Sequence, residues 1–499
     1  MSAVKALLDL SAVQLAALIR SREVTAREVV DAHIERIEAV NPSLNAVVAE
    51  RFEQARAEAD AADARVRAAK DPESLPPLLG IPFTAKEYIA VESMPISGGI
   101  WSRRDIRAEQ DAETVKRLRA AGAICVGITN VPEGGLWLET YNEIYGRTVN
   151  PWSRERSAGG SSGGDGAIVS AGGVPIGLGA DVGGSIRIPA AFCGTVGHKP
   201  SGRLVPNTGF WPEAIGDMNA YLVIGPLTRK VDDLMPVLKA LAGPDGKDPR
   251  CQAFELGDPN EVRVEDLTVY TAPDSGFTKA WPENREALAA AAKRLAAAGA
   301  KVRELDTKRL RRAFMIWSSM MATTGGPSYA EVLGDGKPLR LGRELVRMAL
   351  GRSKHTFPAV AIAGVEKVTD ALPGSVEKSI AAGRALQEEL EALLGPKGVL
   401  LHPPYTRPAP KHYAPMRRPF DFVYTGLFNV LEFPSTVVPM GFDPDGIPLS
   451  VQVIGGRGRD HVTIAAAKVL ESSGGGWQRS NPRWRLDREV GPYSLLNKG

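Results

Sequence analysis

Apolar residues repeat with two different periods along this chain, and the alternation of these periods predicts a sheet covered by helices. Helical spacing begins after Ser11 and again after Thr25, which forms a capping box with Glu28. The second of these helices is predicted to end at Asn41 and Pro42. Further helices are predicted at residues 51–70, 111–121, 282–298, 377–394 and 460–472, and strands at residues 76–86, 123–127, 267–272, 301–305, 398–401, 435–440 and 449–454. Alternation of this kind favours an α/β fold.

Residues 306–375 follow neither period clearly. Six large apolar side chains fall within eight positions, from Phe314 to Met321, and Gly325, Gly326 and Pro327 come soon after them. One interpretation is a core helix. The other is a flexible wall or lid over a substrate pocket, where methionine side chains adapt to varied ligands. We favour the lid, because the segment lies between regular elements.

Composition and charge narrow the class of protein. Of the 499 residues, 43% are hydrophobic and 24% are charged, which is typical of a soluble globular protein. The net charge of +3 is spread along the chain and gives no reason to expect binding to nucleic acid or to an anionic membrane. Three scattered cysteines favour a reducing compartment over a disulfide framework or a metal cluster. Without a signal peptide or an apolar run of roughly 20 residues, we expect a cytoplasmic protein with no membrane span, metal or cofactor.

The strongest candidate for chemistry is the stretch from residue 157 to 197, which holds two serines between glycines. Ser161 and Ser185 lie 24 positions apart, with a largely apolar segment between them that can cross a core and return. Glycine neighbours let the backbone adopt unusual conformations and let a substrate approach closely. Both serines are therefore candidate nucleophiles.

A serine nucleophile can lie in a nucleophile elbow, and its base can be a histidine or a lysine. Residues 159–163 match the nucleophile-elbow pattern G-x-S-x-G, but the preceding polar residues 150–157 are wrong for the buried strand that an elbow requires. None of the six histidines carries a second signal that would make it the base. Lys86 ends an apolar run, and a lysine can replace histidine as the base of a serine nucleophile. Considered together with the two serines, Lys86 is the better candidate.

Several long motifs in this order resemble the amidase signature hydrolases, and the resemblance covers nearly the whole chain. Within that family the chain looks most like the fatty-acid amide hydrolase branch, although it lacks the N-terminal transmembrane segment of that branch's membrane-anchored members. Glu87 stands where many relatives have Asp. The matching segments are GIPFTAKE (80–87), GITNVPE (127–133), YGRTVNPW (145–152), GGSSGGDGA (159–167), GADVGGSIRIPAAFCGTVGHKPS (179–201) and LFNVLEFPSTVVPMGFDPDGIPLSVQVIGG (427–456).

The resemblance implies a Ser-Ser-Lys triad. Ser185 would be the nucleophile, Ser161 a bridging serine that follows a cis peptide bond, and Lys86 the base. A lysine accepts a proton only when it is neutral, so burial would have to lower its pKa well below about 10.4. Ser162 would support Ser161.

The resemblance also implies an oxyanion hole, a set of N–H groups that stabilises the carbonyl oxygen as it gains charge. Its backbone donors would come from Val182, Gly183, Gly184 and Ser185. Asp181 and Arg187 would brace this loop through hydrogen bonds. An apolar acyl or aryl pocket could be lined by Trp137, Leu138, Phe210, Trp211, Phe314 and Trp317.

The implied fold is a single domain with one large mixed β-sheet and helices on both faces. Within residues 1–499 we expect N-terminal helices (1–75), a catalytic core (76–305), the pocket wall or lid (306–375) and a C-terminal part that completes the sheet (376–499). The implied reaction is hydrolysis of the C–N bond of a hydrophobic acyl or aryl amide, with esters and carbamates as further small-molecule substrates. We expect a monomer or a homodimer. The alternatives are the ammonia-releasing A subunit of a glutamyl-tRNA amidotransferase and a catalytically inactive binding protein.

Overall fold

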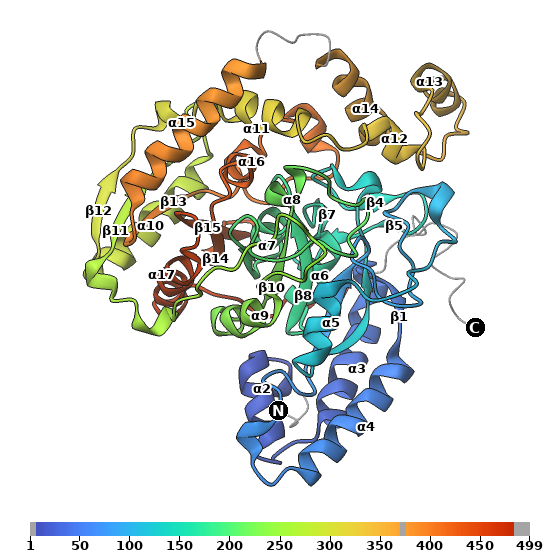
Figure 1. The fold of residues 1–499 in the computed structure, drawn as a ribbon, viewed down its shortest axis with the longest axis vertical. Coiled ribbons are helices and arrows are strands. Elements are labelled where there is room, and N and C mark those ends of the chain that lie inside the picture. The colour runs from blue at the N-terminus through green and yellow to red at the C-terminus, as the bar shows by residue number, and fades with distance from the viewer. Residues whose placement is uncertain (1–5, 370–375, 484–499) are drawn as a thin grey trace.

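The computed structural model describes residues 6–369 and 376–483, and Figure 1 shows its helices and strands. The helices are α2 (Ala12–Arg20), α3 (Ala26–Leu44), α4 (Phe52–Ala68), α5 (Glu113–Ala120), α6 (Gly163–Ser170), α7 (Arg187–Cys193), α8 (Met218–Tyr221), α9 (Leu234–Leu241), α10 (Pro282–Ala297), α11 (Ala313–Ala322), α12 (Tyr329–Leu333), α13 (Leu341–Ala349), α14 (Phe357–Thr369), α15 (Val376–Leu394), α16 (Val423–Val430) and α17 (Asp460–Ser472). The strands are β1 (Val47–Glu50), β2 (Pro82–Lys86), β3 (Ile124–Thr129), β4 (Tyr141–Asn142), β5 (Gly146–Arg147), β6 (Val149–Asn150), β7 (Ser153–Ser157), β8 (Ile176–Asp181), β9 (Val196–Lys199), β10 (Val223–Thr228), β11 (Thr268–Thr271), β12 (Lys301–Glu304), β13 (Gly398–His402), β14 (Ser435–Phe442) and β15 (Pro448–Gly455).

One mixed sheet of 11 strands runs through the molecule in the order β1-β3-β2-β8-β10-β9-β14-β15-β13-β11-β12. β2 lies parallel to both β3 and β8, so the carboxyl ends of these three strands meet at one edge of the sheet. In open α/β sheets this is the edge where ligands bind. The predicted α/β fold with a large mixed sheet in a single domain is therefore confirmed.

Helices cover both faces of the sheet, as predicted. The helices α5, α9, α17 and α10 follow one another along one face, and α6 and α7 pack together on the other. Helices α2 to α4 form the N-terminal end of the molecule, at the bottom of Figure 1. No helix in residues 6–369 or 376–483 combines the length and the apolar character needed to span a bilayer.

The segment between the two serine clusters crosses the core and returns, as predicted. It descends as α6 and comes back as β8, in which all six residues are buried. Ser161 therefore precedes α6, and Ser185 lies in the turn between β8 and α7.

Two predicted boundaries were wrong. The second helix does not end at Asn41 and Pro42 but continues as α3 to Leu44, because a proline in the last turn removes only one hydrogen bond. Asn45, with a left-handed φ of 52°, ends the helix and donates its N–H to the Asn41 carbonyl at 2.7 Å. The predicted strand at 76–86 begins only at Pro82, because the residues before it form turns.

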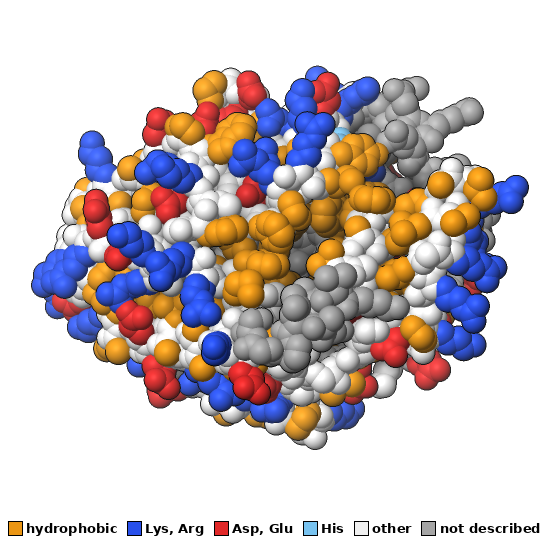
Figure 2. Space-filling view, turned by 90° about the horizontal axis from the view of Figure 1, so that it is seen from above, with side chains coloured by type: hydrophobic (Ala, Val, Ile, Leu, Met, Phe, Trp, Pro, Cys, Tyr) orange, Lys and Arg blue, Asp and Glu red, His pale blue; other side chains and the backbone are white. Residues whose placement is uncertain are grey.

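The apolar cluster at 314–321 forms the regular helix α11. Ile316 and Met320 are buried in the core that α11 shares with α15 and α16, whereas Met315 is 42% exposed. Figure 2 shows the face of the molecule around this region, where apolar side chains gather. The large exposed apolar side chains of α11, α13, α14 and the turn after α13 are Met315, Leu345, Val346, Leu350, Phe357 and Val365. The lid and the four-part division remain predictions, and residues 370–375 lie outside the described residues.

Candidate active site

The parallel strands β2 and β8 position the predicted catalytic residues. Lys86 is the last residue of β2, and Ser185 follows β8 by four positions. Ser161 reaches the same edge from the turn before α6, which packs against both strands. All three side chains are buried, with 2% of Lys86, 3% of Ser161 and 9% of Ser185 exposed.

Lys86 and Ser161 are in direct contact. Lys86 Nζ lies 2.7 Å from Ser161 Oγ and 3.4 Å from the Ala180 carbonyl oxygen. Burial lowers the pKa of Lys86 to about 7, although the negative charges of Asp165 and Asp181 oppose this shift. The peptide bond between Gly160 and Ser161 is cis, as the resemblance implied. This lysine can therefore be neutral near physiological pH.

Ser162 links the two serine turns. Its N–H donates to the Ser185 carbonyl at 3.1 Å, and its Oγ lies 3.3 Å from both the N–H and the carbonyl oxygen of Ala180. Through these bonds the backbone at Ser161 is held against the backbone at Ser185 and against the end of β8.

Asp181 and Arg187 brace the turn that carries Ser185. Arg187 donates from Nε and Nη2 to the two carboxylate oxygens of Asp181, both at 3.0 Å, and neither side chain is exposed. Burial alone would raise the pKa of Asp181, but the charge and the hydrogen bonds of Arg187 outweigh it and hold that pKa well below its usual range. The same carboxylate accepts from the N–H of Gly184 at 2.7 Å and of Ile186 at 3.1 Å.

The Gly184 contact changes the set of available oxyanion donors. Because Asp181 takes the N–H of Gly184, that group is not free for a substrate. Among residues 6–369 and 376–483, neither the N–H of Gly183 nor that of Ser185 donates a hydrogen bond to a backbone carbonyl. Gly184 has a φ of +128°, and a methyl group there would collide with the Thr425 hydroxyl, so only glycine fits this position.

Side chains from distant segments hold the carbonyl groups of the same turn. Asn429 Nδ2 donates to the Asp181 carbonyl at 3.0 Å, and Thr425 Oγ1 donates to the Gly183 carbonyl at 2.7 Å. Trp317 Nε1 donates to the Val182 carbonyl at 3.1 Å. The sequence pattern indicates no role for Asn429 or Thr425, although Asn429 lies inside the matching segment 427–456.

Asp165 is a further buried group that sequence analysis missed. It belongs to α6, and its carboxylate accepts from Thr84 Oγ1 at 3.0 Å and from Thr129 Oγ1 at 2.8 Å. Thr84 lies two residues before Lys86 on β2, and Thr129 is paired with Lys86 across β3. Burial raises the pKa of Asp165 to about 7, against the effect of both hydroxyl groups and of Lys86.

The six predicted pocket residues do not all lie together. Trp317 packs edge-on against Phe422, with ring centres 4.7 Å apart, and Phe314 packs in the same way against Phe420 at 4.6 Å. The backbone of Trp137 and Leu138 lies directly against Gly160, where a methyl group would collide with the Trp137 carbonyl. These four residues thus lie near the two serine turns or on the helix that contacts them.

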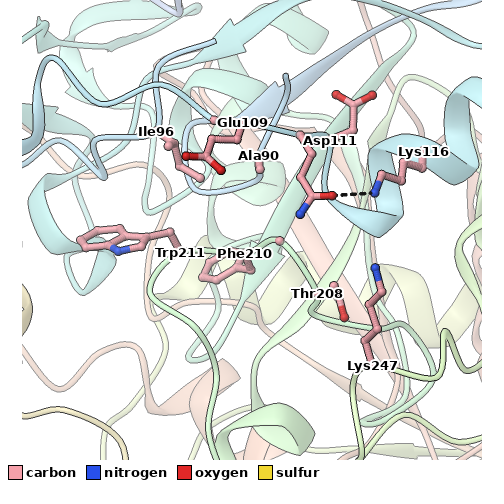
Figure 3. A pocket seen from close by; sticks show the side chains of 12 residues that line it. Ala90, Ile96, Glu109, Asp111, Lys116, Thr208, Phe210, Trp211 and Lys247 are labelled. Atoms are coloured by element: carbon pink, nitrogen blue, oxygen red, sulfur yellow. Dashed lines mark hydrogen bonds between the residues drawn. The ribbon is translucent and has the colours of Figure 1, made fainter. Parts of the chain in front are cut away.

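Phe210 and Trp211 instead line a separate cavity of about 280 Å³, which Figure 3 shows together with Lys116 and Lys247. Neither Lys86 nor either candidate serine lines this cavity. Tyr88 lies between the two sites, because its ring stacks on Phe210 at 5.7 Å and lies 5.4 Å from Lys86 Nζ. A role for these two aromatic residues in an acyl pocket remains a prediction.

The histidine nearest to Ser185 in the sequence, His198, bonds residues outside the candidate triad. His198 is fully buried and bonds Thr436 at 2.9 Å and Asp460 at 3.1 Å, which makes it part of the packing of β9. No histidine in the part of the chain that the structure describes forms a hydrogen bond with Lys86, Ser161 or Ser185. Across the same residues, no three His, Cys, Asp or Glu side chains are grouped so that they could hold a metal ion.

Comparisons with known proteins agree with this architecture. The family model described as Amidase matches residues 28–464. Fatty-acid amide hydrolase 2-A of Danio rerio is 42% identical over 95% of this chain and 90% of its own length, and fatty-acid amide hydrolase 2 of Homo sapiens is 39% identical over 94% of this chain and 90% of its own. The solved structure of 6-aminohexanoate cyclic dimer hydrolase complexed with substrate is 27% identical, covers 94% of this chain and 97% of its own, and has a TM-score of 0.77. The chain belongs to the amidase signature family and is an amide hydrolase, close to the fatty-acid amide hydrolases.

Proposed function

We propose that this enzyme hydrolyses hydrophobic acyl or aryl amides through an acyl-enzyme on Ser185, with Ser161 as the bridging serine and Lys86 as the base. The observation that carries this proposal is the buried contact of 2.7 Å between Lys86 Nζ and Ser161 Oγ. A serine hydroxyl is a weak nucleophile until a base removes its proton. A lysine with a pKa of about 7 is half neutral at that pH, so it can accept this proton.

The reaction begins with two coupled proton transfers. Ser185 Oγ gives its proton to Ser161 Oγ, and Ser161 gives its own proton to the lone pair of neutral Lys86. Ser185 Oγ forms a bond to the substrate carbonyl carbon, and the carbonyl oxygen becomes an oxyanion. When this intermediate collapses, the C–N bond breaks and the proton returns from Lys86 through Ser161 to the leaving nitrogen.

Water then hydrolyses the acyl-enzyme, and the same three residues transfer its proton. A water molecule gives one proton to the relay and attacks the ester carbonyl, and Ser185 recovers its proton as the acid leaves. The N–H groups of Gly183 and Ser185 are free to donate to the oxyanion in both steps. Loss of one such donor typically costs about 3–4 kcal/mol of barrier.

The surroundings favour an apolar acyl or aryl group. Trp317, Phe314, Phe420 and Phe422 form an aromatic wall next to the turn that carries Ser185. The relatives named as fatty-acid amide hydrolases point to the same substrate class. Esters and carbamates would react by the same acyl transfer, because the attack on the carbonyl does not depend on the leaving atom.

The amidotransferase subunit and the inactive binding protein remain the competing proposals. A subunit of an ammonia-releasing complex should co-purify with its partners and should be idle towards simple amides. An inactive binding protein should turn over neither simple amides nor glutamine.

The test is an activity screen of the purified protein on amides, esters and carbamates that differ in acyl size. We expect turnover that increases with the apolar character of the acyl group and that disappears in Ser185→Ala. Turnover restricted to glutamine in the presence of co-purified partners would support the amidotransferase subunit instead.

A further inference from the structure

The helix α11 contacts the catalytic turn directly, although it lies outside every motif that the family resemblance uses. One face of α11 is fixed in the core by Ile316 and Met320. Trp317, next to Ile316, turns its indole ring towards Val182 and Gly183. A methyl group built on Gly183 would lie 3.6 Å from this ring, which is ordinary van der Waals contact. The indole therefore lies against the turn at Val182 and Gly183.

The carbonyl groups of three successive residues in this turn are each bound by a different side chain. Asn429 and Thr425, both on α16, hold the carbonyl groups of Asp181 and Gly183. The carbonyl group between them, that of Val182, accepts from Trp317 at 3.1 Å. Without Trp317, α16 would hold the turn at both ends but not in the middle.

The orientation of one peptide plane follows from this contact. The peptide bond between Val182 and Gly183 is trans, so its C=O and N–H point in opposite directions. A bond that draws the Val182 carbonyl towards α11 therefore directs the Gly183 N–H away from α11. That N–H has no acceptor among the described residues, and its direction is set by the Trp317 bond.

We propose that Trp317 is a positioning residue for the reaction: its indole N–H fixes the Val182–Gly183 peptide so that the Gly183 N–H donates to the developing oxyanion. The proposal rests on the proposed function, in which Ser185 attacks the carbonyl carbon. Trp317 touches the turn and not the reacting atoms, so its effect should fall on the transition state more than on substrate binding.

The test compares Trp317→Phe with a matched variant elsewhere in the chain. Phenylalanine keeps an aromatic ring at this place and removes the only donor. Trp477 offers the control, because its Nε1 makes the same kind of bond, to the Ser170 carbonyl at 3.1 Å, away from the catalytic turn. Trp477→Phe thus removes an equivalent indole–carbonyl bond without touching the oxyanion hole.

Two readouts separate positioning from packing. We expect Trp317→Phe to lower kcat about tenfold or more with KM changed less than threefold, because a misdirected donor loses part of the 10²–10³-fold effect of a lost one. A trifluoromethyl ketone, whose carbonyl carbon bonds to Ser185 Oγ and whose oxygen becomes an oxyanion, should bind Trp317→Phe more weakly by a similar factor. Trp477→Phe should keep the wild-type kcat and the wild-type affinity for the ketone.

The outcomes distinguish failure of this inference from failure of the proposed function. If the ketone inhibits the wild type but a folded Trp317→Phe variant keeps the wild-type kcat and the wild-type affinity for the ketone, the positioning role is wrong. A change in KM alone would also overturn it and would make Trp317 only a pocket wall. If the ketone does not inhibit the wild type, or binds Ser185→Ala as tightly as it binds the wild type, the proposed function itself is wrong. Trp317→Leu replaces the phenylalanine variant, with the same expectations, if the latter does not fold.

Discussion

Replacing Lys86 by methionine should make the protein more stable while it abolishes catalysis. Burial lowers the pKa of Lys86 from 10.5 to about 7, a difference of about 3.5, and each pKa unit corresponds to about 1.36 kcal/mol. Releasing this proton on folding at pH 7 therefore costs the wild type about 4–5 kcal/mol. Methionine removes this cost but also leaves Ser161 without its partner, which costs about 1–3 kcal/mol. The expected net gain in the free energy of unfolding is about 1–4 kcal/mol at pH 7.

The sign of the pH dependence follows from the two protonation states. Above pH 10.5, Lys86 is neutral in both the folded and the unfolded chain and adds no pH dependence. As the pH falls from there towards 7, only the unfolded chain takes up the proton, so the wild type loses stability relative to Lys86→Met. Below about pH 7 the folded chain is protonated as well, and the loss stops growing.

The assay is urea unfolding of the wild type and of Lys86→Met at pH 7, 8 and 9. The stability advantage of the variant should shrink by about 2–3 kcal/mol between pH 7 and pH 9. A difference that stays constant over this range would refute the lowered pKa of Lys86, and with it the case for a neutral base.

A second buried lysine provides the control. Burial also lowers the pKa of Lys199 to about 7, but its Nζ donates to the Pro200 carbonyl at 2.9 Å and not to a serine. Lys199→Met should show a similar pH-dependent gain in stability and keep its activity within about tenfold. Lys86→Met should lose at least about 10³-fold in kcat.

Three further predictions concern residues around the triad. Asp165→Asn should move the acidic limb of the kcat/KM profile to lower pH, because the negative charge that favours the protonated form of Lys86 is lost. The other neighbours do not compensate, since Tyr88 and Ser161 are uncharged and Asp181 stays ionised, and an unmoved limb would contradict this prediction. Gly184→Ala should lower kcat at least about 10²-fold, because the added methyl group overlaps the Thr425 hydroxyl; wild-type kinetics would count against the required backbone geometry. Trp317→Ala should change the ratio of kcat/KM for short and long acyl amides by about tenfold, or about 1.4 kcal/mol, whereas a loss of about 3–5 kcal/mol in stability with an unchanged ratio would favour a pure core role.

The sequence alone predicted the fold class and the identity of the candidate catalytic residues. Lys86 ends an apolar run whose last five residues form the fully buried strand β2, and the glycine-flanked serines proved to lie in turns at the same edge of the sheet. These features are local, so their residue types and spacing carry the signal.

The contacts that hold the catalytic turn could not be predicted in the same way. Trp317 and Val182 are separated by 135 positions, and Thr425 and Gly183 by 242. Nothing in the local pattern of either segment indicates which distant carbonyl group it will bind. The same holds for Phe210 and Trp211, because their apolar side chains predict an apolar wall but not which cavity they line.

The most direct test of the mechanism is to locate the covalent adduct. The wild type, Ser185→Ala and Ser161→Ala are treated with a fluorophosphonate, and the modified peptide is identified by mass spectrometry. We expect one adduct per chain, on Ser185 in the wild type, slow labelling of the same residue in Ser161→Ala and none in Ser185→Ala. An adduct on Ser161, or labelling of Ser185→Ala at the wild-type rate, would contradict the assignment of Ser185 as the nucleophile.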